Sequence, residues 1–375
     1  MSYARGRAAF FLEPTDRIPR FETIYHPGML ARLSGLDPIA QPLGASLAAM
    51  RALDMDVYRV GALPTRASTL KQGETAATAS QAMNITAFSG ALASEAADPP
   101  EGVASKSRLS YWGLVDSETQ VVFDVTTPEE VYAYDPGRAD PRPQAEVTAD
   151  YRRQLSEAEA LVGDLAYTTA LFYTTLFMWP VMLFGWELFL VAAAEDPQRF
   201  RRVWDGFAEQ TMKHLTAWAD AGAKVVFCHD DLAMTNQLVF RPAWYREHIF
   251  PWYRRFWRML HERGVRVIFT CDGAFDPLVE DLIALGVDGF QVERRFDIAR
   301  FLERYGQSQV LVAGVDQRTL TFGTSEDVER ATRETAELGR RSPGFIWRAD
   351  TSIPGNIPLE NLETYFACQD KYGRR

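Results

Sequence analysis

The sequence predicts an α/β fold, a single (β/α)8 barrel of the TIM type with helical and hairpin additions near the N-terminus. Five short apolar runs each lead into a carboxylate, and these carboxylates are Asp230, Asp272, Glu293, Asp316 and Asp350. Helical patterns separate the runs, and continuous apolar runs are typical of parallel strands that are buried on both faces. Charged side chains at the C-terminal ends of barrel strands indicate a site. The pattern therefore predicts an enzyme.

The chain has 375 residues, which is long enough for one large barrel. We expect one domain over residues 1–375, with an N-terminal segment at 1–60, ornamented loops and hairpins at 61–150, and regular β/α units at 151–375. Within the first segment, residues 20–24 are expected to be extended, 44–55 helical, and 57–60 the first barrel strand. The Pro-rich stretch 136–143 is placed inside the domain, because the second half alone supplies too few strands to close a barrel.

The second half alternates strands with helices, which predicts a parallel sheet with right-handed connections. Gly222 ends one predicted helix, Pro242 opens the next, and Pro251 is expected to kink it. The predicted strands are 224–228, 265–270, 288–292, 310–315 and 344–349, and the predicted helices are 196–220, 243–263, 274–285, 325–340 and one that opens at Pro358. The apolar stretch 171–194 is expected to be a buried helix or a pocket wall, because Pro180, Gly185 and Glu187 interrupt it.

Composition excludes several classes of function. The net charge of -10 argues against a nucleic-acid partner, which favours a basic face. The three cysteines have no paired spacing, so we expect a reducing, cytoplasmic setting rather than a disulfide framework. No signal peptide or membrane span is expected. The oligomeric state stays open, with a homodimer as one arrangement.

The run His229-Asp230-Asp231 is the densest polar cluster in the sequence, and it directly follows a predicted strand. We expect all three residues to be catalytic, with His229 as a proton carrier near neutral pH or as a metal ligand. The alternative is a loop in which an aspartate caps a helix or binds an arginine.

Two further carboxylates complete the catalytic candidates. Asp272 follows the next strand and Glu293 the one after it. Together His229, Cys271 and Asp272 could form a non-standard metal site, since these residue types suit zinc. The alternatives are a buried Cys271 that acts as a small hydrophobe and a surface ion pair between Glu293 and the arginines that follow it.

Substrate-binding candidates are polar or aromatic side chains that are expected near the strand ends. Arg348 and Asp350 could equally pair with each other, and the aromatic residues between 167 and 190 could equally be core. The predicted substrate-binding residues are His26, Tyr173, Trp179, Cys271, Asp316, Arg348 and Asp350.

From about residue 185 onward, the order of motifs resembles the uroporphyrinogen decarboxylase superfamily, which holds the decarboxylase of haem biosynthesis and the corrinoid-linked methyltransferases. The motifs, in order, are Gly185-Trp-Glu-Leu-Phe-Leu190, Asp230-Asp231-Leu-Ala with Arg241-Pro242, Cys271-Asp272-Gly273, Leu285-Gly-Val-Asp-Gly289, and Ile353-Pro354 with Pro358-Leu-Glu-Asn361. Weaker similarities at Asp16-Arg17-Ile18-Pro19 and Tyr111-Trp112-Gly113 extend it over most of the chain. The resemblance implies one distorted barrel with its site at the strand C-termini.

One departure from the family pattern makes the resemblance closer to the methyltransferase-like members, and a second concerns the zinc ligands of those members. The haem-pathway decarboxylase grips propionates with an arginine-rich glycine motif near its N-terminus, and residues 20–26 lack that motif. The methyltransferase branch binds zinc through a His-any-Cys pair and a later Cys, and the aligned residues here are Thr270, Asp272 and Thr351. Thr is a poor zinc ligand, so zinc is uncertain.

The resemblance therefore implies methyl transfer that involves a corrinoid, as a substrate or bound to a partner corrinoid protein, and a small methyl donor or acceptor. A first alternative is decarboxylation of a porphyrinogen or another small carboxylic acid. A second is a non-catalytic barrel that has lost its metal site, which the aligned threonines support.

Overall fold

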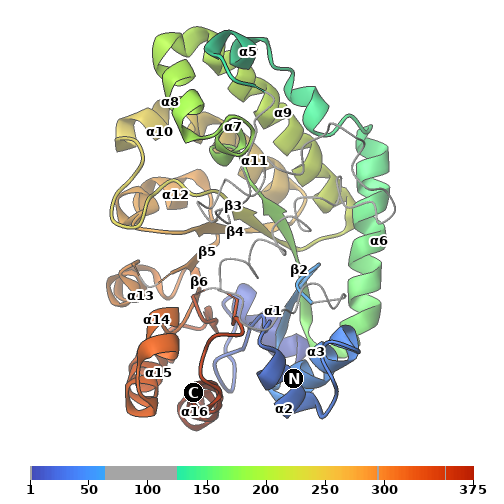
Figure 1. Ribbon diagram of the computed structural model, residues 1–375, viewed down its shortest axis with the longest axis vertical. Coiled ribbons are helices and arrows are strands. Elements are labelled where there is room, and N and C mark those ends of the chain that lie inside the picture. The colour runs from blue at the N-terminus through green and yellow to red at the C-terminus, as the bar shows by residue number, and fades with distance from the viewer. Residues whose placement is uncertain (1, 64–124, 294, 351) are drawn as a thin grey trace.

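The computed structural model describes residues 2–63, 125–293, 295–350 and 352–375. In this part of the chain, seven parallel strands form one sheet in sequence order (Figure 1). The strands are β1 (Val57–Arg59), β2 (Tyr167–Tyr173), β3 (Val225–His229), β4 (Arg266–Cys271), β5 (Gly289–Val292), β6 (Val310–Ala313) and β7 (Phe345–Trp347). Sequential order without crossovers within the sheet is the order of a barrel of β/α units, so the predicted fold class is confirmed.

Residues 19–25 are extended and lie between β7 and β1. The Trp347 N–H donates to the Pro19 carbonyl and the Phe21 N–H donates to the Trp347 carbonyl, both at 2.8 Å. On the other side, the Val57 N–H donates to the Arg20 carbonyl at 3.2 Å. This segment therefore takes the eighth position and joins the two edges of the sheet, where the sequence predicted a short extended piece.

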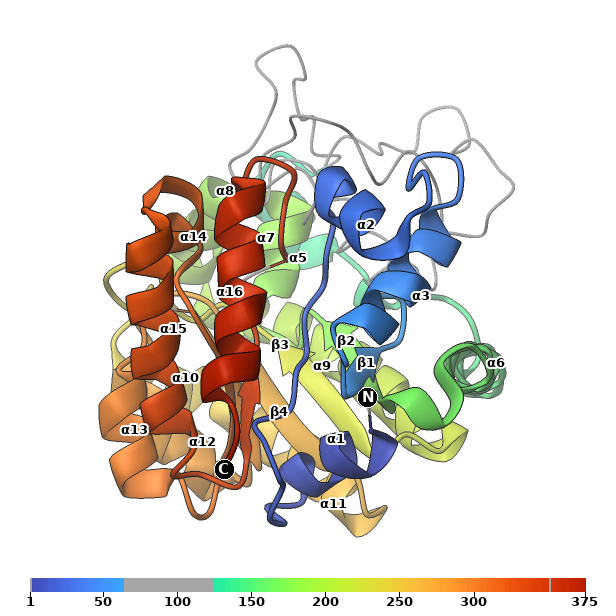
Figure 2. The same cartoon turned by 90° about the horizontal axis from the view of Figure 1, so that it is seen from below.

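Helix α1 (Tyr3–Phe10) packs across the N-terminal end of the strands (Figure 2). The Phe10 ring contacts the rings of Tyr167 and Phe227, with centroids at 5.8 and 6.0 Å. These residues belong to an apolar cluster inside the ring of strands that also contains Val57, Ile268, Val310 and Ile346. The N-terminal end of the barrel is therefore filled, and only the C-terminal end is left for a site.

The other helices surround the strands (Figures 1 and 2). Most begin after a capping side chain or at a proline, as the sequence indicated: Asp196 caps α9, and Gly222 ends it with a φ of 110°. The helices are α2 (Pro27–Ser34), α3 (Pro42–Ala52), α5 (Pro128–Ala133), α6 (Gln144–Val162), α7 (Met178–Phe184), α8 (Trp186–Glu195), α9 (Pro197–Ala221), α10 (Pro242–His248), α11 (Phe250–Glu262), α12 (Val279–Leu285), α13 (Ile298–Tyr305), α14 (Gln317–Phe322), α15 (Ser325–Gly339) and α16 (Leu359–Tyr372). Short 3-10 turns lie at η2 (Pro136–Ala139), η3 (Gly163–Leu165) and η4 (Asp276–Leu278).

Three predicted elements differ in detail. The helix expected at 243–263 breaks into α10 and α11, because Pro251 has no N–H to continue the helical hydrogen bonds. The helix expected from residue 274 begins later, with η4 and then α12. The apolar stretch 171–194 is no single helix: it contains the end of β2 and then α7 and α8, which Gly185 separates with a φ of 79°. The hairpins expected between 61 and 125 lie almost entirely outside the described residues.

No single helix among the described residues is long and apolar enough to cross a membrane. The pair α7 and α8 reaches the required length and composition only together, and it is bent by 117°.

Strand periodicity places the site above the apolar cluster. Alternate residues of a strand point to the same face of the sheet. Phe227 lies in the interior cluster, and His229 is two residues further along β3. In the same way, Arg59 lies two residues after Val57, and Arg348 lies two residues after Ile346. The barrel interior therefore changes from apolar to polar toward the C-terminal ends of its strands, which we call the mouth.

Candidate active site

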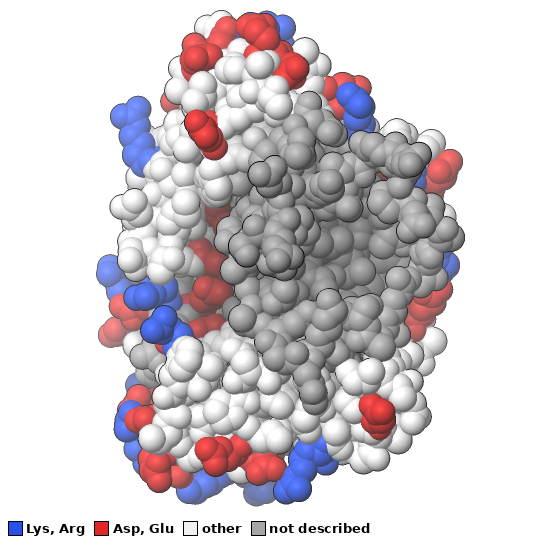
Figure 3. Space-filling view, viewed as in Figure 1, with Lys and Arg blue, Asp and Glu red and all other residues white. Residues whose placement is uncertain are grey.

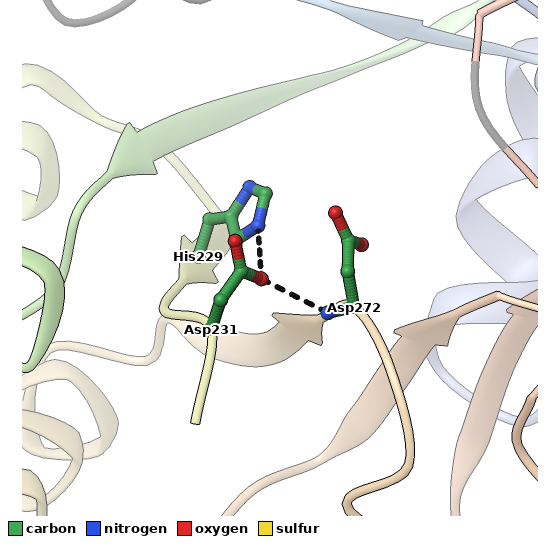
Figure 4. Close-up of side chains that lie close together, drawn as sticks. All are labelled: His229, Asp231 and Asp272. Atoms are coloured by element: carbon green, nitrogen blue, oxygen red, sulfur yellow. Dashed lines mark hydrogen bonds and ion pairs between the residues drawn. The ribbon is translucent and has the colours of Figure 1, made fainter. Parts of the chain in front are cut away.

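His229, Asp231 and Asp272 form the centre of the mouth (Figure 4). His229 ends β3, Asp231 follows it, and Asp272 follows β4. The His229 Nε2 lies 2.9 Å from Asp231 Oδ1, and the Asp272 N–H donates to that same oxygen at 2.9 Å. Each residue offers one ligand atom, and these atoms all lie within 4.8 Å of one another. This arrangement can hold a proton or a cation.

The charges of this cluster shift its acid–base behaviour. Burial lowers the pKa of His229, but the adjacent Asp231 carboxylate more than offsets this effect, and the pKa lies above its usual value. Burial, followed by the charges of Glu293 and Asp231, raises the pKa of Asp272 well above its usual value. Neighbouring carboxylates resist joint ionisation, which favours bound protons or a bound cation.

Glu293 extends the acidic cluster toward β5. Burial, then the charges of Asp350, Asp231 and Asp316, raises the pKa of the Glu293 carboxyl to about 8. On the face seen in Figure 3, Asp and Glu side chains gather in a hollow near β5 and β6. Five successive strand ends, from β3 to β7, thus contribute carboxylates to one electrostatic environment, as the sequence pattern predicted except that Asp231 takes the place of Asp230.

Asp316 and Asp350 lie at the side of the mouth formed by β6 and β7. Asp316 caps α14, where its Oδ1 accepts from the Arg318 N–H at 2.8 Å. The Gln317 N–H donates to Asp350 Oδ2 at 3.4 Å. Both carboxylates therefore support the start of α14 while they add negative charge to the site.

Asp230 does not face this cluster. Its carboxylate accepts from the backbone N–H groups of Leu176, Phe177 and Met178 at 2.6 to 2.8 Å, and from the Tyr253 hydroxyl at 2.6 Å. Burial raises its pKa to about 6 in spite of these donors. These contacts hold the start of α7 in place. Asp230 therefore has the geometry of a structural residue, and not of the catalytic group that the sequence predicted.

Cys271 also lies outside the ligand cluster. Its thiol is fully buried, accepts from the Leu232 N–H at 3.3 Å, and has a pKa that burial raises well above the usual value. A buried thiol of this kind is a packing group. The prediction of a metal site formed by His229, Cys271 and Asp272 is therefore wrong in one residue. The third potential ligand beside His229 and Asp272 is Asp231, and not Cys271.

The aromatic candidates and His26 divide between pocket and core. The ring of Tyr173 contacts the ring of His229, with centroids at 4.4 Å, so it borders the site. Trp179 is buried, donates from Nε1 to Thr211 Oγ1 at 3.2 Å, and stacks on Phe207, which places it in the core. His26 accepts from the Met29 N–H at 3.0 Å, and its Nε2 lies 2.9 Å from the Ile357 carbonyl. One ring nitrogen of His26 therefore caps α2 and the other contacts the segment before α16, so this histidine has a structural role.

Two buried arginines lie beneath the acidic cluster. The sequence predicted Arg348, which is 3% exposed, but it did not single out Arg59, which is 6% exposed at the end of β1. The sequence did contain a signal for Arg59, because Val57-Tyr58-Arg59 is one more apolar run that ends in a charge.

Glu22 is a second buried residue that the sequence pattern did not predict. It accepts from the Tyr365 hydroxyl at 2.7 Å and from the Ala349 N–H at 2.9 Å.

The donor set of the central cluster fits zinc. One imidazole and two carboxylates are zinc ligand types, and three protein ligands leave the fourth position open, as in catalytic sites. Thr270 lies beside His229 in the register between β3 and β4, and its Oγ1 is buried without a hydrogen-bond partner among the described residues. A metal-bound group at this position would satisfy that oxygen.

Comparison with known proteins identifies related sequences and a related fold. The sequence model of the uroporphyrinogen decarboxylase (URO-D) family matches residues 172–372. The uroporphyrinogen decarboxylase of Syntrophotalea carbinolica is 24% identical over 175 residues, which cover 46% of this chain and 49% of the relative. That of Pseudoalteromonas atlantica is 25% identical over 185 residues, which cover 48% of this chain and 50% of the relative. The chain thus spans about half the length of the curated relatives it matches.

Among solved structures, a methyltransferase from Methanosarcina mazei matches with a TM-score of 0.63 and covers 99% of both chains. Its sequence identity of 16% means that this likeness concerns the fold alone.

Proposed function

The chain belongs to the uroporphyrinogen decarboxylase family, and on that premise we propose that it is an enzyme that transfers a methyl group between a corrinoid and a small methyl donor or acceptor. One observation carries the proposal: His229, Asp231 and Asp272 bring three ligand atoms within 4.8 Å of one another at the mouth of the barrel. Such a cluster is suited to activating the heteroatom to which a methyl group is bound or transferred.

A zinc ion would be held by His229, Asp231 and Asp272, and when bound it would act as a Lewis acid on a thiol, an ether oxygen or an amine. The protein's own contacts prepare this arrangement. The Asp272 N–H fixes the Asp231 carboxylate, which in turn orients the His229 ring. Tyr173 packs against that ring and limits its movement.

Glu293 supplies a proton in this proposal. Because its pKa is raised to about 8, its carboxyl holds a proton at neutral pH. Cleavage of a methyl ether or a methylamine needs a general acid for the leaving oxygen or nitrogen. Glu293, in the electrostatic environment of Asp231, Asp316 and Asp350, is the carboxyl that we assign to that role.

The corrinoid part of the proposal rests on the family resemblance and on the location of the site at the C-terminal ends of the strands. The N-terminal end of the barrel is closed by α1, so a large cofactor, free or carried by a corrinoid protein, would approach from the strand C-termini.

Decarboxylation of a porphyrinogen is the second candidate, and the two curated decarboxylases that match half of the chain favour it. The acidic mouth opposes it. A substrate with eight carboxylates would have to bind in a mouth lined by Asp231, Asp272, Glu293, Asp316 and Asp350, where only Arg59 and Arg348 are buried cations among the described residues. Binding of an octacarboxylate porphyrin at micromolar concentration would favour this candidate over methyl transfer.

The central test combines metal binding with methyl transfer. We expect the purified protein to bind one zinc ion, with occupancy that falls at low pH because the ligands must lose protons. His229→Ala and Asp272→Asn should lower both zinc affinity and methyl exchange with methylcobalamin by about 100-fold or more, since each removes a ligand. Metal analysis and the visible spectrum of the corrinoid measure the two effects.

Glu262→Gln is the control, because it removes an exposed carboxylate of α11 that takes no part in the acidic cluster of the mouth. It should retain zinc and activity. Full activity in His229→Ala and Asp272→Asn, or no cobalt-methyl exchange with any thiol, methyl ether or methylamine, would refute the proposed function.

A further inference from the structure

Arg59 and Arg348 are two buried cations at the base of the mouth. Arg59 ends β1 and Arg348 follows β7, and the extended segment 19–25 lies between these strands. The guanidinium carbons of Arg59 and Arg348 lie 5.7 and 4.8 Å from the centroid of the same ring, that of Phe21. Both arginines occupy inward positions, two residues beyond members of the interior apolar cluster. They therefore form the boundary between the apolar floor of the barrel and the polar mouth.

Neither arginine has a carboxylate partner among the described residues. The side chain of Arg59 makes no hydrogen bond or ion pair in that part of the chain, although it is 6% exposed. Arg348 donates from Nη1 to Thr23 Oγ1 at 3.2 Å, and its Nε is buried without a partner. The charge of Glu22 favours the cationic form of Arg348, but the Glu22 oxygens accept hydrogen bonds from Tyr365, Gln369 and Ala349 instead.

Arg20 shows how this chain accommodates a buried arginine that has a structural role. It is 2% exposed, donates to the carbonyls of Leu53 and Phe366, and forms an ion pair with Asp370 at 2.8 Å. Arg59 has none of these compensations within the described part of the chain. Buried charges are normally paired, because an unpaired one loses its hydration without a replacement.

Arg59 stays a cation at neutral pH. Burial, followed by the charge of Arg348, lowers its pKa only to about 9. The charge of Arg348 also acts on Asp272, where it partly opposes the rise in the pKa of that carboxyl. The arginines and the central cluster lie at the C-terminal ends of parallel strands of the same sheet, so they face one mouth.

We propose that Arg59 and Arg348 bind the carboxylate of the substrate, so that the substrate class is a small organic acid that carries its methyl group on a heteroatom. The carboxylate would lie on the guanidinium groups, whose planar forks match its two oxygens, and the methyl-bearing end would lie at His229, Asp231 and Asp272. Buried Gln291 Oε1 and Thr270 Oγ1, which lack partners among the described residues, offer further polar contacts on adjacent strands. This inference rests on the proposed function, because both place the substrate at the mouth of the barrel.

The test compares two acids with their neutral amides. Binding of methoxyacetate and 4-methoxybenzoate, and of the corresponding amides, is measured by saturation-transfer NMR and calorimetry with a chelator present, so that no carboxylate can bind through a metal. We expect at least one acid to bind about tenfold or more tightly than its amide, as a charge-assisted bidentate contact should. Arg59→Gln and Arg348→Gln should each reduce this preference to less than about twofold.

Arg330→Gln is the control, because the side chain of Arg330 is 57% exposed on α15 and pairs with Asp327 of the same helix. It should keep the full preference for the acid. Thermal unfolding gives a second measurement: without ligand, Arg59→Gln should be at least as stable as the parent, and the acid should stabilise only the parent.

If neither acid is preferred over its amide in the parent protein, the inference is overturned, whatever the variants do. A large loss of stability in ligand-free Arg59→Gln would likewise overturn it, because Arg59 would then serve the fold. Preference for the acid without methyl transfer would refute the proposed function alone. Zinc-dependent methyl transfer without preference for the acid would refute this inference alone.

Discussion

Asp230 and Asp231 are adjacent in the sequence and have different surroundings. The Asp230 carboxylate accepts four hydrogen bonds from the start of α7 and from Tyr253, whereas Asp231 faces His229 and Asp272. Neighbouring side chains of an extended segment point to opposite sides, so one aspartate enters the packed layer and the other enters the mouth. Adjacent positions in the sequence therefore do not imply a shared role.

This difference predicts that two neighbouring substitutions change stability by very different amounts. Asp230→Ala should lower the free energy of unfolding by about 3 kcal/mol or more, because it leaves several buried donors without an acceptor. Asp231→Ala should change it by less than about 1 kcal/mol, because the lost hydrogen bonds are offset by relief of repulsion with Asp272. Urea denaturation of both variants measures the effect, and equal losses would contradict the assignment of Asp230 as an anchor.

At the scale of elements, α1 and the segment that follows it complete the barrel. Arg5 in α1 donates to Asp56 at 2.6 Å and to Asp16 at 2.7 Å, and thereby ties the helix to the residues before β1. Gly6 allows the close approach, because a Cβ at this position would lie 2.1 Å from the Asp56 carbonyl oxygen and 2.9 Å from the Tyr167 Cβ. The closed N-terminal end of the barrel thus depends on one small residue.

Gly6→Ala should therefore displace α1 and lower the free energy of unfolding by about 1–3 kcal/mol through overpacking. Gly44 in α3 is the matched control, because a Cβ there would make only an ordinary contact with Leu36 at 3.5 Å. Gly44→Ala should stabilise the protein by about 0.5–1 kcal/mol through helix propensity. Chemical denaturation of the two variants compares them, and a Gly6→Ala variant as stable as Gly44→Ala would show that α1 does not pack as described.

At the scale of the whole molecule, negative charge is concentrated where it destabilises the folded state. The chain carries a net charge of -10, and Asp231, Asp272, Glu293, Asp316 and Asp350 add carboxylates to one mouth. Folding brings these groups together, so protons or a cation bind more tightly to the folded state than to the unfolded chain.

The sign of the resulting pH dependence follows from Glu293. Its pKa rises from an ordinary 4.5 to about 8 on folding, so between these values the folded protein holds a proton that the unfolded chain has lost. Stability should therefore fall as the pH rises from about 5 to about 8, by up to about 1.4 kcal/mol per pH unit from this group. Glu293→Gln should flatten the dependence in metal-free protein, as measured by urea denaturation across this range.

Glu262→Gln, at an exposed position on α11, should leave the slope of the parent unchanged. A slope in Glu293→Gln that equals that of the parent would show that Glu293 ionises normally in the folded state.

The sequence by itself determined the architecture and the location of the site. Apolar runs, helix-opening prolines and helix-ending glycines such as Gly222 act through local preferences of the backbone, so the order of strands and helices could be derived from them. The ends of parallel strands meet at one edge of the sheet, so carboxylates after successive runs were expected to converge, and Asp272 and Glu293 do so.

Only the tertiary structure decided which side chains face that site. Asp231 rather than Cys271 joins His229, Trp179 lies in the core, and Arg59 enters the mouth. The direction of each side chain depends on strand register and on the helix packed behind it, and these are set by contacts between residues far apart in the sequence. Phe21, for example, lies between Arg59 and Arg348 because an N-terminal segment pairs with the last strand, which no local pattern records.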